Sequence, residues 1–319
     1  MTHPWSHRIA MALAAGACTL LASCGSGSVV SDLNANRAIT VGDGFEDVGQ
    51  GPTGMEFTVN DGSGNWVQSF VSNYGLTMTP AKSGGWGYAQ GYAQVATAAT
   101  DPNGNAVPSV SDQITTLLAR TTLTKNDIVM INGGMSDIVA AVKATGISAQ
   151  TTSTVTAAAD ALANQVQRLV NAGATHVVVT GVYDLGMTPW AAAYGGFGGP
   201  VSALSTAFNN ELLLQLNHFA NVSPNPVLFF GAAEFFDFAY NSVAQSTTSN
   251  GNFGLTNITT AVCNTPTAAT CTTATLIDPN YSAYLFADNL YLTPAVQRLF
   301  VNTGYAQNVL SLFQNVWGS

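Results

Sequence analysis

The sequence predicts an α/β protein whose central parallel sheet is covered by helices on both faces. Short apolar runs of strand length alternate along the chain with longer stretches of helical periodicity, which is typical of strands buried between two helical layers. The chain has 319 residues, enough for one large core without a second domain. Residues 37–319 are therefore predicted to form a single domain.

The predicted strands are the apolar runs. The first is Ile39 to Val41, and the helix after it is marked by apolar residues at helical spacing: Trp66, Val67, Phe70, Val71 and Tyr74. Four more candidate strands follow at Leu76 to Met78, Ile128 to Ile131, Val177 to Thr180 and Val227 to Phe230.

Two later helices have clear end signals. The first carries one apolar stripe and ends before Gly173, which stands where a C-terminal glycine cap belongs; the stripe is Val155, Leu162, Val166 and Leu169. Thr293 and Pro294 form an N-cap and first-turn pair, which predicts that the final helix begins there. The aromatic residues Phe229, Phe230, Phe235 and Phe236 are predicted to pack in the core.

The N-terminus predicts the compartment. The apolar stretch from Ile9 to Leu21 follows a basic segment and has the length of a signal peptide rather than of a membrane span. It ends at Leu21-Ala22-Ser23-Cys24, which resembles a bacterial lipobox. We therefore predict a lipoprotein signal peptide at 1–23, a lipidated Cys24 and a flexible tether at 24–36. An ordinary cleavage site with an incidental cysteine is the alternative.

The location expected from this anchor is the bacterial cell envelope. Gly25 lacks the aspartate that resembles an inner-membrane retention signal, which favours the outer membrane. Charged residues make up only 8% of the chain, which suits a secreted or envelope protein. After removal of the signal peptide 7 basic and 17 acidic residues remain, a net charge of −10. This charge disfavours nucleic acid as a partner, and membrane contact is expected only through the lipid.

The remaining cysteines, Cys263 and Cys271, lie in a Thr- and Ala-rich loop of an oxidising compartment and are predicted to form a local disulfide. The Cys and His residues have no metal-site spacing, so the sequence supports neither a metal nor a cofactor.

The segment Val41 to Gly49 reads VGDGFEDVG. It resembles the first block of the GDSL-type, or SGNH, ester hydrolases, Gly-Asp-Ser-Leu-Ser-Asp-x-Gly. The position of that family's nucleophilic serine is occupied by Gly44, which has no side chain and cannot form an acyl-enzyme. The resemblance implies a flavodoxin-like three-layer α/β/α fold.

Further blocks follow in family order, and the resemblance spans roughly Ile39 to Leu299. In the second block, Tyr88 to Ala93, the resemblance implies that the N–H of Gly91 helps to hold the oxyanion. In the third, Gly134 to Asp137, Ser136 takes the place of the family's asparagine donor. The segments Gly173 to Pro189 and Leu204 to Leu216 resemble the family's fourth strand with its loop and the helix after it. In the last block, Leu285 to Pro294, Asp288 is retained and Tyr291 stands at the histidine base position.

No residue obviously replaces the missing base. A phenol such as that of Tyr291, with an ordinary pKa of about 10, is a poor base at neutral pH. The two histidines of the mature chain, His176 and His218, are predicted at a strand entrance and within a helix, away from the crevice. Ser136 is the best substitute nucleophile, but it has no visible base.

Groups that could bind a ligand are still present although the catalytic serine and histidine of the family are missing. The turn at Gly44 is expected to present N–H groups at the start of a helix, which suits a polar or anionic group. Aromatic side chains could contact a sugar or acyl chain, or could simply fill the space of the lost groups: Trp86, Tyr88, Tyr92 and Tyr291.

The sequence thus predicts a lipid-anchored, catalytically degenerate protein that binds a glycan, an acylated molecule or an envelope protein. A working GDSL-type esterase or acylhydrolase with a rearranged site is the alternative, and a purely structural envelope lipoprotein is a third.

Overall fold

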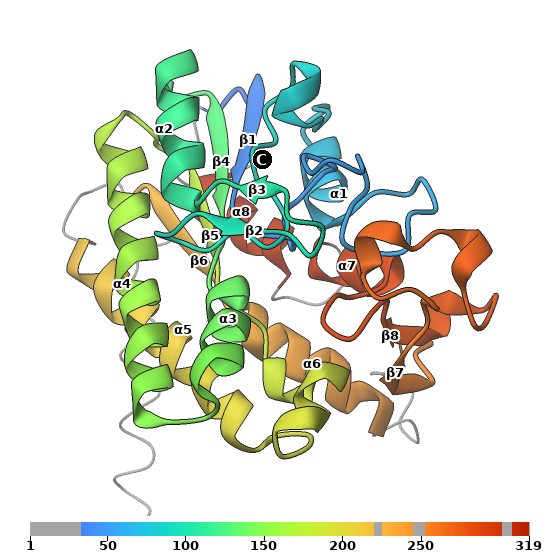
Figure 1. The fold of residues 1–319 in the computed structure, drawn as a ribbon. Coiled ribbons are helices and arrows are strands. Elements are labelled where there is room, and N and C mark those ends of the chain that lie inside the picture. The colour runs from blue at the N-terminus through green and yellow to red at the C-terminus, as the bar shows by residue number, and fades with distance from the viewer. Residues whose placement is uncertain (1–32, 220–224, 245–252, 302–307, 319) are drawn as a thin grey trace, which may run out of the picture.

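A computed structural model describes residues 33–219, 225–244, 253–301 and 308–318 (Figure 1). At its centre is a four-stranded parallel sheet of order β1-β4-β5-β6, formed by β1 (Arg37–Val41), β4 (Asp127–Ile131), β5 (Val177–Thr180) and β6 (Val227–Phe230). The predicted α/β class is confirmed, as are four of the five predicted strands.

The central strands are buried on both faces. Every residue of β4 and β5 is buried, as expected where helices cover both sides of a parallel sheet. Val41, the last residue of β1, is in register with Ile131, the last residue of β4. The turns that follow these two strands therefore begin side by side at one edge of the sheet.

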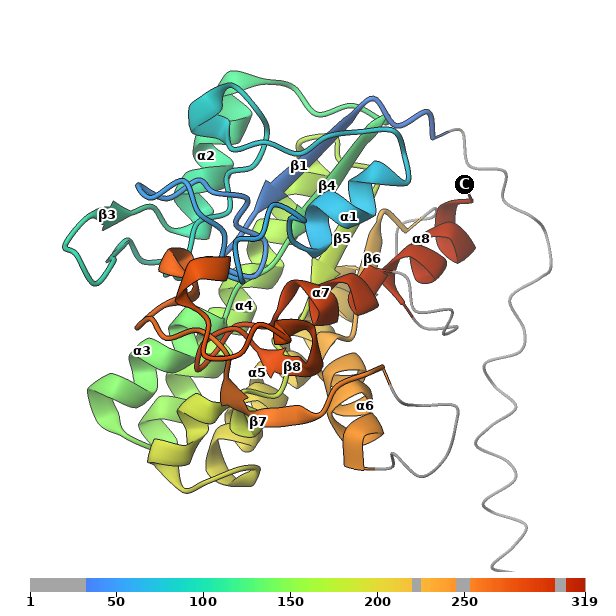
Figure 2. The same ribbon diagram turned by 90° about the vertical axis from the view of Figure 1, so that its right-hand side faces the viewer.

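Helices form a layer on each side of the sheet (Figure 2). One layer contains α1 (Trp66–Ser72), α7 (Pro294–Val301) and α8 (Val309–Trp317), with α6 (Ala232–Ala244) packed against α7. In the other layer α4 (Ala149–Asn171) packs against three helices, α2 (Val110–Arg120), α3 (Met135–Thr145) and α5 (Gly199–Phe219).

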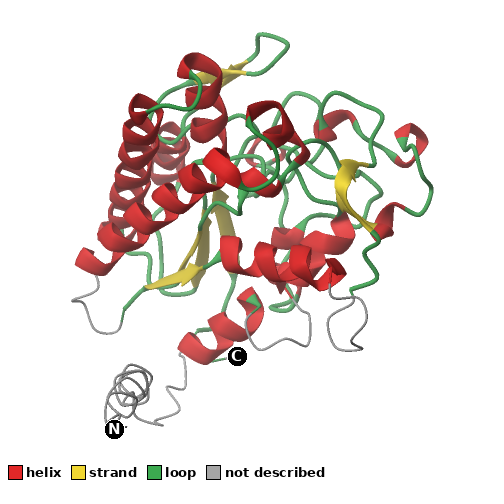
Figure 3. Cartoon of the chain, turned by 90° about the horizontal axis from the view of Figure 1, so that it is seen from below, coloured by secondary structure: helices red, strands yellow, loops and turns green. Residues whose placement is uncertain are grey.

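Two short strand pairs lie outside the central sheet (Figure 3). One is antiparallel, β2 (Ala99–Thr100) with β3 (Ala106–Val107); the other is parallel, β7 (Asn257–Ala261) with β8 (Tyr284–Phe286). The predicted disulfide between Cys263 and Cys271 is present, with a Cα–Cα distance of 5.8 Å. The segment after β7 is therefore closed into a small loop.

The predicted strand at Leu76 to Met78 is wrong: these residues are irregular. The free edge of β1 is instead covered by residues 86–88, where the N–H of Thr40 donates to Trp86 O and the N–H of Tyr88 donates to Thr40 O. Pro80 begins a short 3-10 turn that returns the chain towards this edge. The pairing in this part of the described chain consists of isolated bridges, Thr40 with Gly87 and Pro80 with Gly87.

The helix signals are largely confirmed. Gly173 follows the end of α4 with φ +105°, the left-handed backbone that glycine adopts without steric cost. A helix does begin at Pro294, but it is not the final one, because α8 follows it. Tyr74 lies beyond the end of α1, and Phe230, Phe235 and Phe236 are buried as predicted, with Phe229 packed partly buried against them.

Residues 1–32, including the predicted signal peptide and Cys24, lie outside the described residues. The end of the predicted tether, 33–36, packs on the domain: Leu33 and Ala35 are partly buried against the core, and the N–H of Asn36 donates to Asn126 O. No helix in the described ranges is both long enough and apolar enough to cross a membrane.

Candidate functional site

Gly44 and Tyr291 share one space. A β-carbon built on Gly44 would lie 2.7 Å from Cζ of Tyr291 and still closer to its hydroxyl oxygen, well inside van der Waals contact. Tyr291 is only 5% exposed, so the ring cannot swing into solvent without leaving the core. The tyrosine ring therefore occupies the volume into which any side chain at position 44 would project.

Asp288 fixes the loop that presents this ring. Its carboxylate accepts hydrogen bonds from the N–H groups of Leu290 at 2.8 Å, Tyr291 at 2.7 Å and Ala268 at 2.6 Å. Burial raises its pKa, and the three N–H donors oppose that rise. Asp288 thus forms hydrogen bonds within its own loop and ties that loop to the disulfide loop, 263–271.

Asp43 and Asn132 join the turns after β1 and β4. Asn132 Nδ2 donates to Asp43 Oδ1 at 2.7 Å, and the N–H of Asp43 donates back to Asn132 Oδ1 at 2.9 Å. Gln113 on α2 forms a similar reciprocal pair with Gly42, the residue before Asp43. Its side-chain amide accepts from the N–H of Gly42 and donates to the carbonyl of Gly42. These two buried amides hold the 42–44 turn in place.

The sequence missed both Asn132 and Gln113. The usable signal for Asn132 is that it directly follows β4, in line with Gly42 after β1. The expected helix after Gly44 is also wrong: residues 44–46 form a turn in which Asp43 accepts from the N–H of Phe45 through its side chain and from that of Glu46 through its carbonyl.

Gly91 lies in the same region, but its N–H is already used. It donates to Asp47 Oδ2 at 2.8 Å, while Asp47 Oδ1 accepts from the N–H groups of Gly49 and Gln50. Phe57 packs directly on Gly91, because a β-carbon there would lie 2.8 Å from Cε1 of the ring and closer still to its tip. The Phe57 ring also contacts Tyr291, with centroids 4.8 Å apart.

A comparison with protein-family models decides the identity of the chain. Residues 38–303 match the model described as GDSL-like Lipase/Acylhydrolase. The chain belongs to this GDSL-like family. Comparison with curated proteins found no significant match. The resemblance seen in the sequence blocks is thereby confirmed, and the parallel sheet flanked by helices fits the α/β fold of the family.

In this GDSL-like domain Ser136, at the asparagine position of the third block, is the second residue of α3 and partly buried. Within the described ranges its hydroxyl makes no hydrogen bond to a base. His176 lies just before β5, packed against Trp317 with ring centroids 5.1 Å apart, and burial lowers its pKa. His218 is on α5, where it contacts Gln215. Neither imidazole is placed to serve Ser136.

Buried acids are concentrated at this edge of the GDSL-like domain. Asp43, Glu46 and Asp47 are all fully buried, and loss of solvent raises the pKa of each, that of Asp47 to about 6. Burial likewise raises the pKa of Asp137 to about 7, although its carboxylate accepts from the N–H of Val95. Within the described residues no three His, Cys, Asp or Glu side chains are grouped to hold a metal.

The tyrosines of the site are protonated at neutral pH. Burial, with Asp43 and Asp288 nearby, raises the pKa of both Tyr183 and Tyr291 well above 10. The Tyr183 hydroxyl donates to Leu290 O at 2.5 Å. Neither phenol can act as a base at neutral pH.

The four aromatic residues expected at the site separate into two groups. Trp86 packs against two arginines: Arg37 and Arg120 lie over its ring at 4.6 and 3.9 Å from the centroid. Arg120 also donates to the Tyr88 hydroxyl. These are structural contacts.

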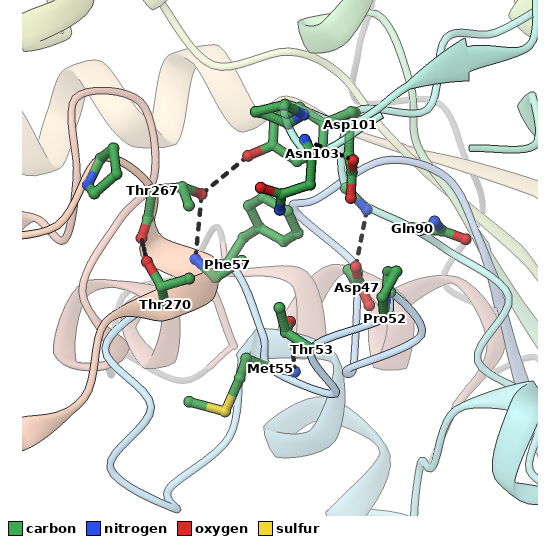
Figure 4. Close-up of a pocket in the computed structure, with 16 residues that line it drawn as sticks. Asp47, Pro52, Thr53, Met55, Phe57, Gln90, Asp101, Asn103, Thr267 and Thr270 are labelled. Atoms are coloured by element: carbon green, nitrogen blue, oxygen red, sulfur yellow. Dashed lines mark hydrogen bonds between the residues drawn. The ribbon is translucent and has the colours of Figure 1, made fainter. Parts of the chain in front are cut away.

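Tyr92, in contrast, lines an open cavity beside the site (Figure 4). Asp47, Phe57 and Gly91 also border this cavity, whereas Gly44, Ser136 and Tyr291 do not. Open space therefore remains beside Phe57, whose ring contacts both Tyr92 and Tyr291.

Proposed function

We propose that this GDSL-like protein is a lipid-anchored envelope protein that binds a ligand and does not hydrolyse esters. One observation carries the proposal: the volume that a nucleophile at position 44 would need is filled by Tyr291. If the site lacked only a serine, a serine side chain would fit at position 44. Here the Tyr291 ring occupies the space that this side chain would need.

The chemistry supports the same conclusion. Ester hydrolysis by a serine enzyme needs an activated hydroxyl and a base that takes and returns its proton. Tyr291 stands at the base position and is protonated, while both imidazoles are placed elsewhere. Loss of such groups removes on the order of a millionfold in turnover. The N–H of Gly91, a donor expected for the oxyanion, is bonded to Asp47.

Lipid anchoring through Cys24 is part of the proposal and is tested separately. We expect the full-length protein to incorporate an alkyne-labelled fatty acid in bacteria and to fractionate with membranes. The Cys24→Ala variant is expected to lose the label and leave the membrane fraction. A labelled Cys24→Ala protein would contradict the assignment.

The proposed lack of esterase activity is tested on the full-length protein in detergent. We expect no labelling by a fluorophosphonate probe and no turnover of short-chain nitrophenyl esters. The triple variant Gly44→Ser, Ser136→Asn, Tyr291→His is expected to gain esterase activity, while Gly44→Ser alone stays inactive because Tyr291 still fills the space.

The alternative, a working esterase with a rearranged site, predicts the opposite result. Labelling and turnover of the unmodified protein that are abolished by Ser136→Ala would establish it and overturn the binding role. Activity that survives Ser136→Ala would place the nucleophile elsewhere and would equally overturn it.

A further inference from the structure

The cavity beside the filled site is built by three separate segments. They are the loop 47–57, the stretch 90–103 and the disulfide loop, which contributes Pro266, Thr267, Ala269 and Thr270. The cavity volume is about 190 Å³. Since pockets for drug-sized ligands measure roughly 300–1,000 Å³, this space fits one ring rather than an extended chain.

Flat apolar surfaces form much of the wall. The rings of Phe57 and Tyr92 meet nearly at a right angle, at 81°, with centroids 5.4 Å apart. Three prolines, Pro52, Pro102 and Pro266, and the thioether of Met55 complete the apolar lining. Such faces stack against the C–H surface of a ring.

Polar groups are interspersed among these faces. Hydroxyls of Thr53, Thr267 and Thr270 and the amide of Asn103 stand around the opening (Figure 4). Gln90 lies at the margin of the cavity and is only 8% exposed. The cavity therefore offers neutral donors and acceptors to a ligand.

The charges at the cavity disfavour anionic ligands. No described Lys, Arg or His lines it, although Lys82 Nζ donates to the carbonyl of the lining residue Gly51, and the carboxylates of Asp47 and Asp101 repel anions. Both carboxylates already accept hydrogen bonds: Asp101 from Asn103 N, Asn105 N and Asn105 Nδ2, and Asp47 from the N–H groups of Gly49, Gln50 and Gly91. Few of their lone pairs therefore remain to coordinate a cation.

The walls are braced before any ligand arrives. The Tyr92 hydroxyl donates to Thr267 Oγ1 at 3.1 Å, which links two of the segments. The Cys263–Cys271 bond closes the third segment, and Asp288 holds its Ala268 N–H. Tyr92 has φ +69°, the only positive φ of a non-glycine residue in the described ranges. A conformation of this kind costs of order 1–3 kcal/mol and is kept only where the surroundings enforce it.

We infer that this cavity binds one uncharged, hydroxyl-rich ring, that is, a neutral saccharide residue. Stacking faces, neutral hydrogen-bonding groups, single-ring size and negative charge all fit that ligand class. This inference rests on the proposed binding role and names its ligand, although the cavity and its chemistry would be the same in an active protein.

The test is calorimetric titration of the full-length protein with neutral mono- and disaccharides, among them glucose, galactose, N-acetylglucosamine and cellobiose. Decanoate and choline are the comparison ligands for an acyl chain and a cation. We expect binding of at least one neutral saccharide and of neither comparison ligand.

Substitutions in the cavity wall test whether the saccharide binds in this cavity. Thr270→Trp and Asn103→Trp each introduce an indole at an exposed position that lines the cavity, from two different segments. We expect each to weaken saccharide binding at least tenfold at an unchanged melting temperature. Thr273→Trp, at an exposed threonine beyond Cys271 and outside the cavity, is the control and is expected to bind normally.

Three results would overturn the inference: no neutral saccharide binds, decanoate or choline binds instead, or saccharide binding is unaffected by both cavity variants. These outcomes are distinct from failure of the proposed function. Fluorophosphonate labelling would refute the non-catalytic role whether or not the cavity binds a saccharide.

Discussion

Asp43 and Asn132, 89 positions apart, exchange two hydrogen bonds at the carboxyl edge of the sheet, and both side chains are buried. The pair joins the first turn of the GDSL-like domain to the turn after β4. Burial raises the pKa of Asp43, and this rise is opposed by the side chain of Asn132 and by the N–H groups of Phe45, Met135 and Ser136.

Replacement of Asn132 by alanine is expected to destabilise the fold by about 2–4 kcal/mol, because it leaves a buried acid with fewer donors. Urea denaturation measures the change. Asn264→Ala, at an exposed asparagine, is the control and is expected to change stability by under about 0.5 kcal/mol. Equal effects of the two substitutions would show that the Asp43–Asn132 pair contributes nothing.

Gly44→Ser is expected to cost about 1–3 kcal/mol, because its side chain overlaps Tyr291. Combined with Tyr291→His, the same serine should cost clearly less, and the double-mutant cycle should give a coupling of about 1–2 kcal/mol. Gly51→Ser is the control, since its nearest neighbour would be 4.0 Å from the new β-carbon. Additive effects of the two changes would rule out the shared space.

Stability is expected to fall as the pH rises from about 4 to about 7. Burial raises the pKa of Asp47 to about 6 and those of Glu56 and Asp137 to about 7, whereas the unfolded chain ionises near 3.8–4.5. The folded state therefore holds more protons in this interval, so the stabilisation is complete below the unfolded pKa and is lost as pH passes the folded one.

For Asp137 this amounts to on the order of 4 kcal/mol, at about 1.4 kcal/mol per pKa unit. Scanning calorimetry at fixed ionic strength measures the trend in melting temperature. Asp137→Asn keeps an acceptor for the N–H of Val95 and should flatten the slope. A melting temperature that rises between pH 4.5 and 7 would contradict the prediction.

Reduction of the Cys263–Cys271 disulfide is expected to cost roughly 2–3 kcal/mol, the loop-closure value for cysteines 8 positions apart. Guanidinium denaturation with and without a phosphine reductant measures it. The variant Cys263→Ser, Cys271→Ser is the control: it should match the reduced protein and show no further response to reductant. Full stability after reduction would mean that Asp288 alone holds the loop.

Much of the fold follows from local sequence signals. The strands Ile128 to Ile131 and Val227 to Phe230 are apolar throughout, Val177 to Thr180 is apolar except for its last residue, and Gly173 marks a helix end. The strand predicted at Leu76 to Met78 was wrong because a strand forms only where a partner strand is available for pairing. Pro80 and the glycines after it instead form a turn. The last helix, α8, was not predicted, although Asn308 is its N-cap and accepts from the N–H of Ser311.

The site was predictable in its positions but not in its contacts. The block pattern brings Gly44, Ser136 and Tyr291 to one edge of the sheet, and the structure places the first and last in contact. The sequence could not show that the Tyr291 ring occupies the space above Gly44, or that the Phe57 ring covers Gly91. These contacts depend on packing between segments far apart in the chain, as do those of Asn132 and Gln113.

The close approach of the Tyr291 ring to Gly44 also limits which single substitutions this protein can tolerate at the two positions. Restoring a hydroxyl first creates a clash, and shrinking the aromatic ring first leaves a void; either intermediate is less stable than the present chain and gains no chemistry. Two residues 247 positions apart would have to change together. If the proposed non-catalytic role is correct, single-step mutation therefore offers no gradual route to a serine nucleophile at that turn.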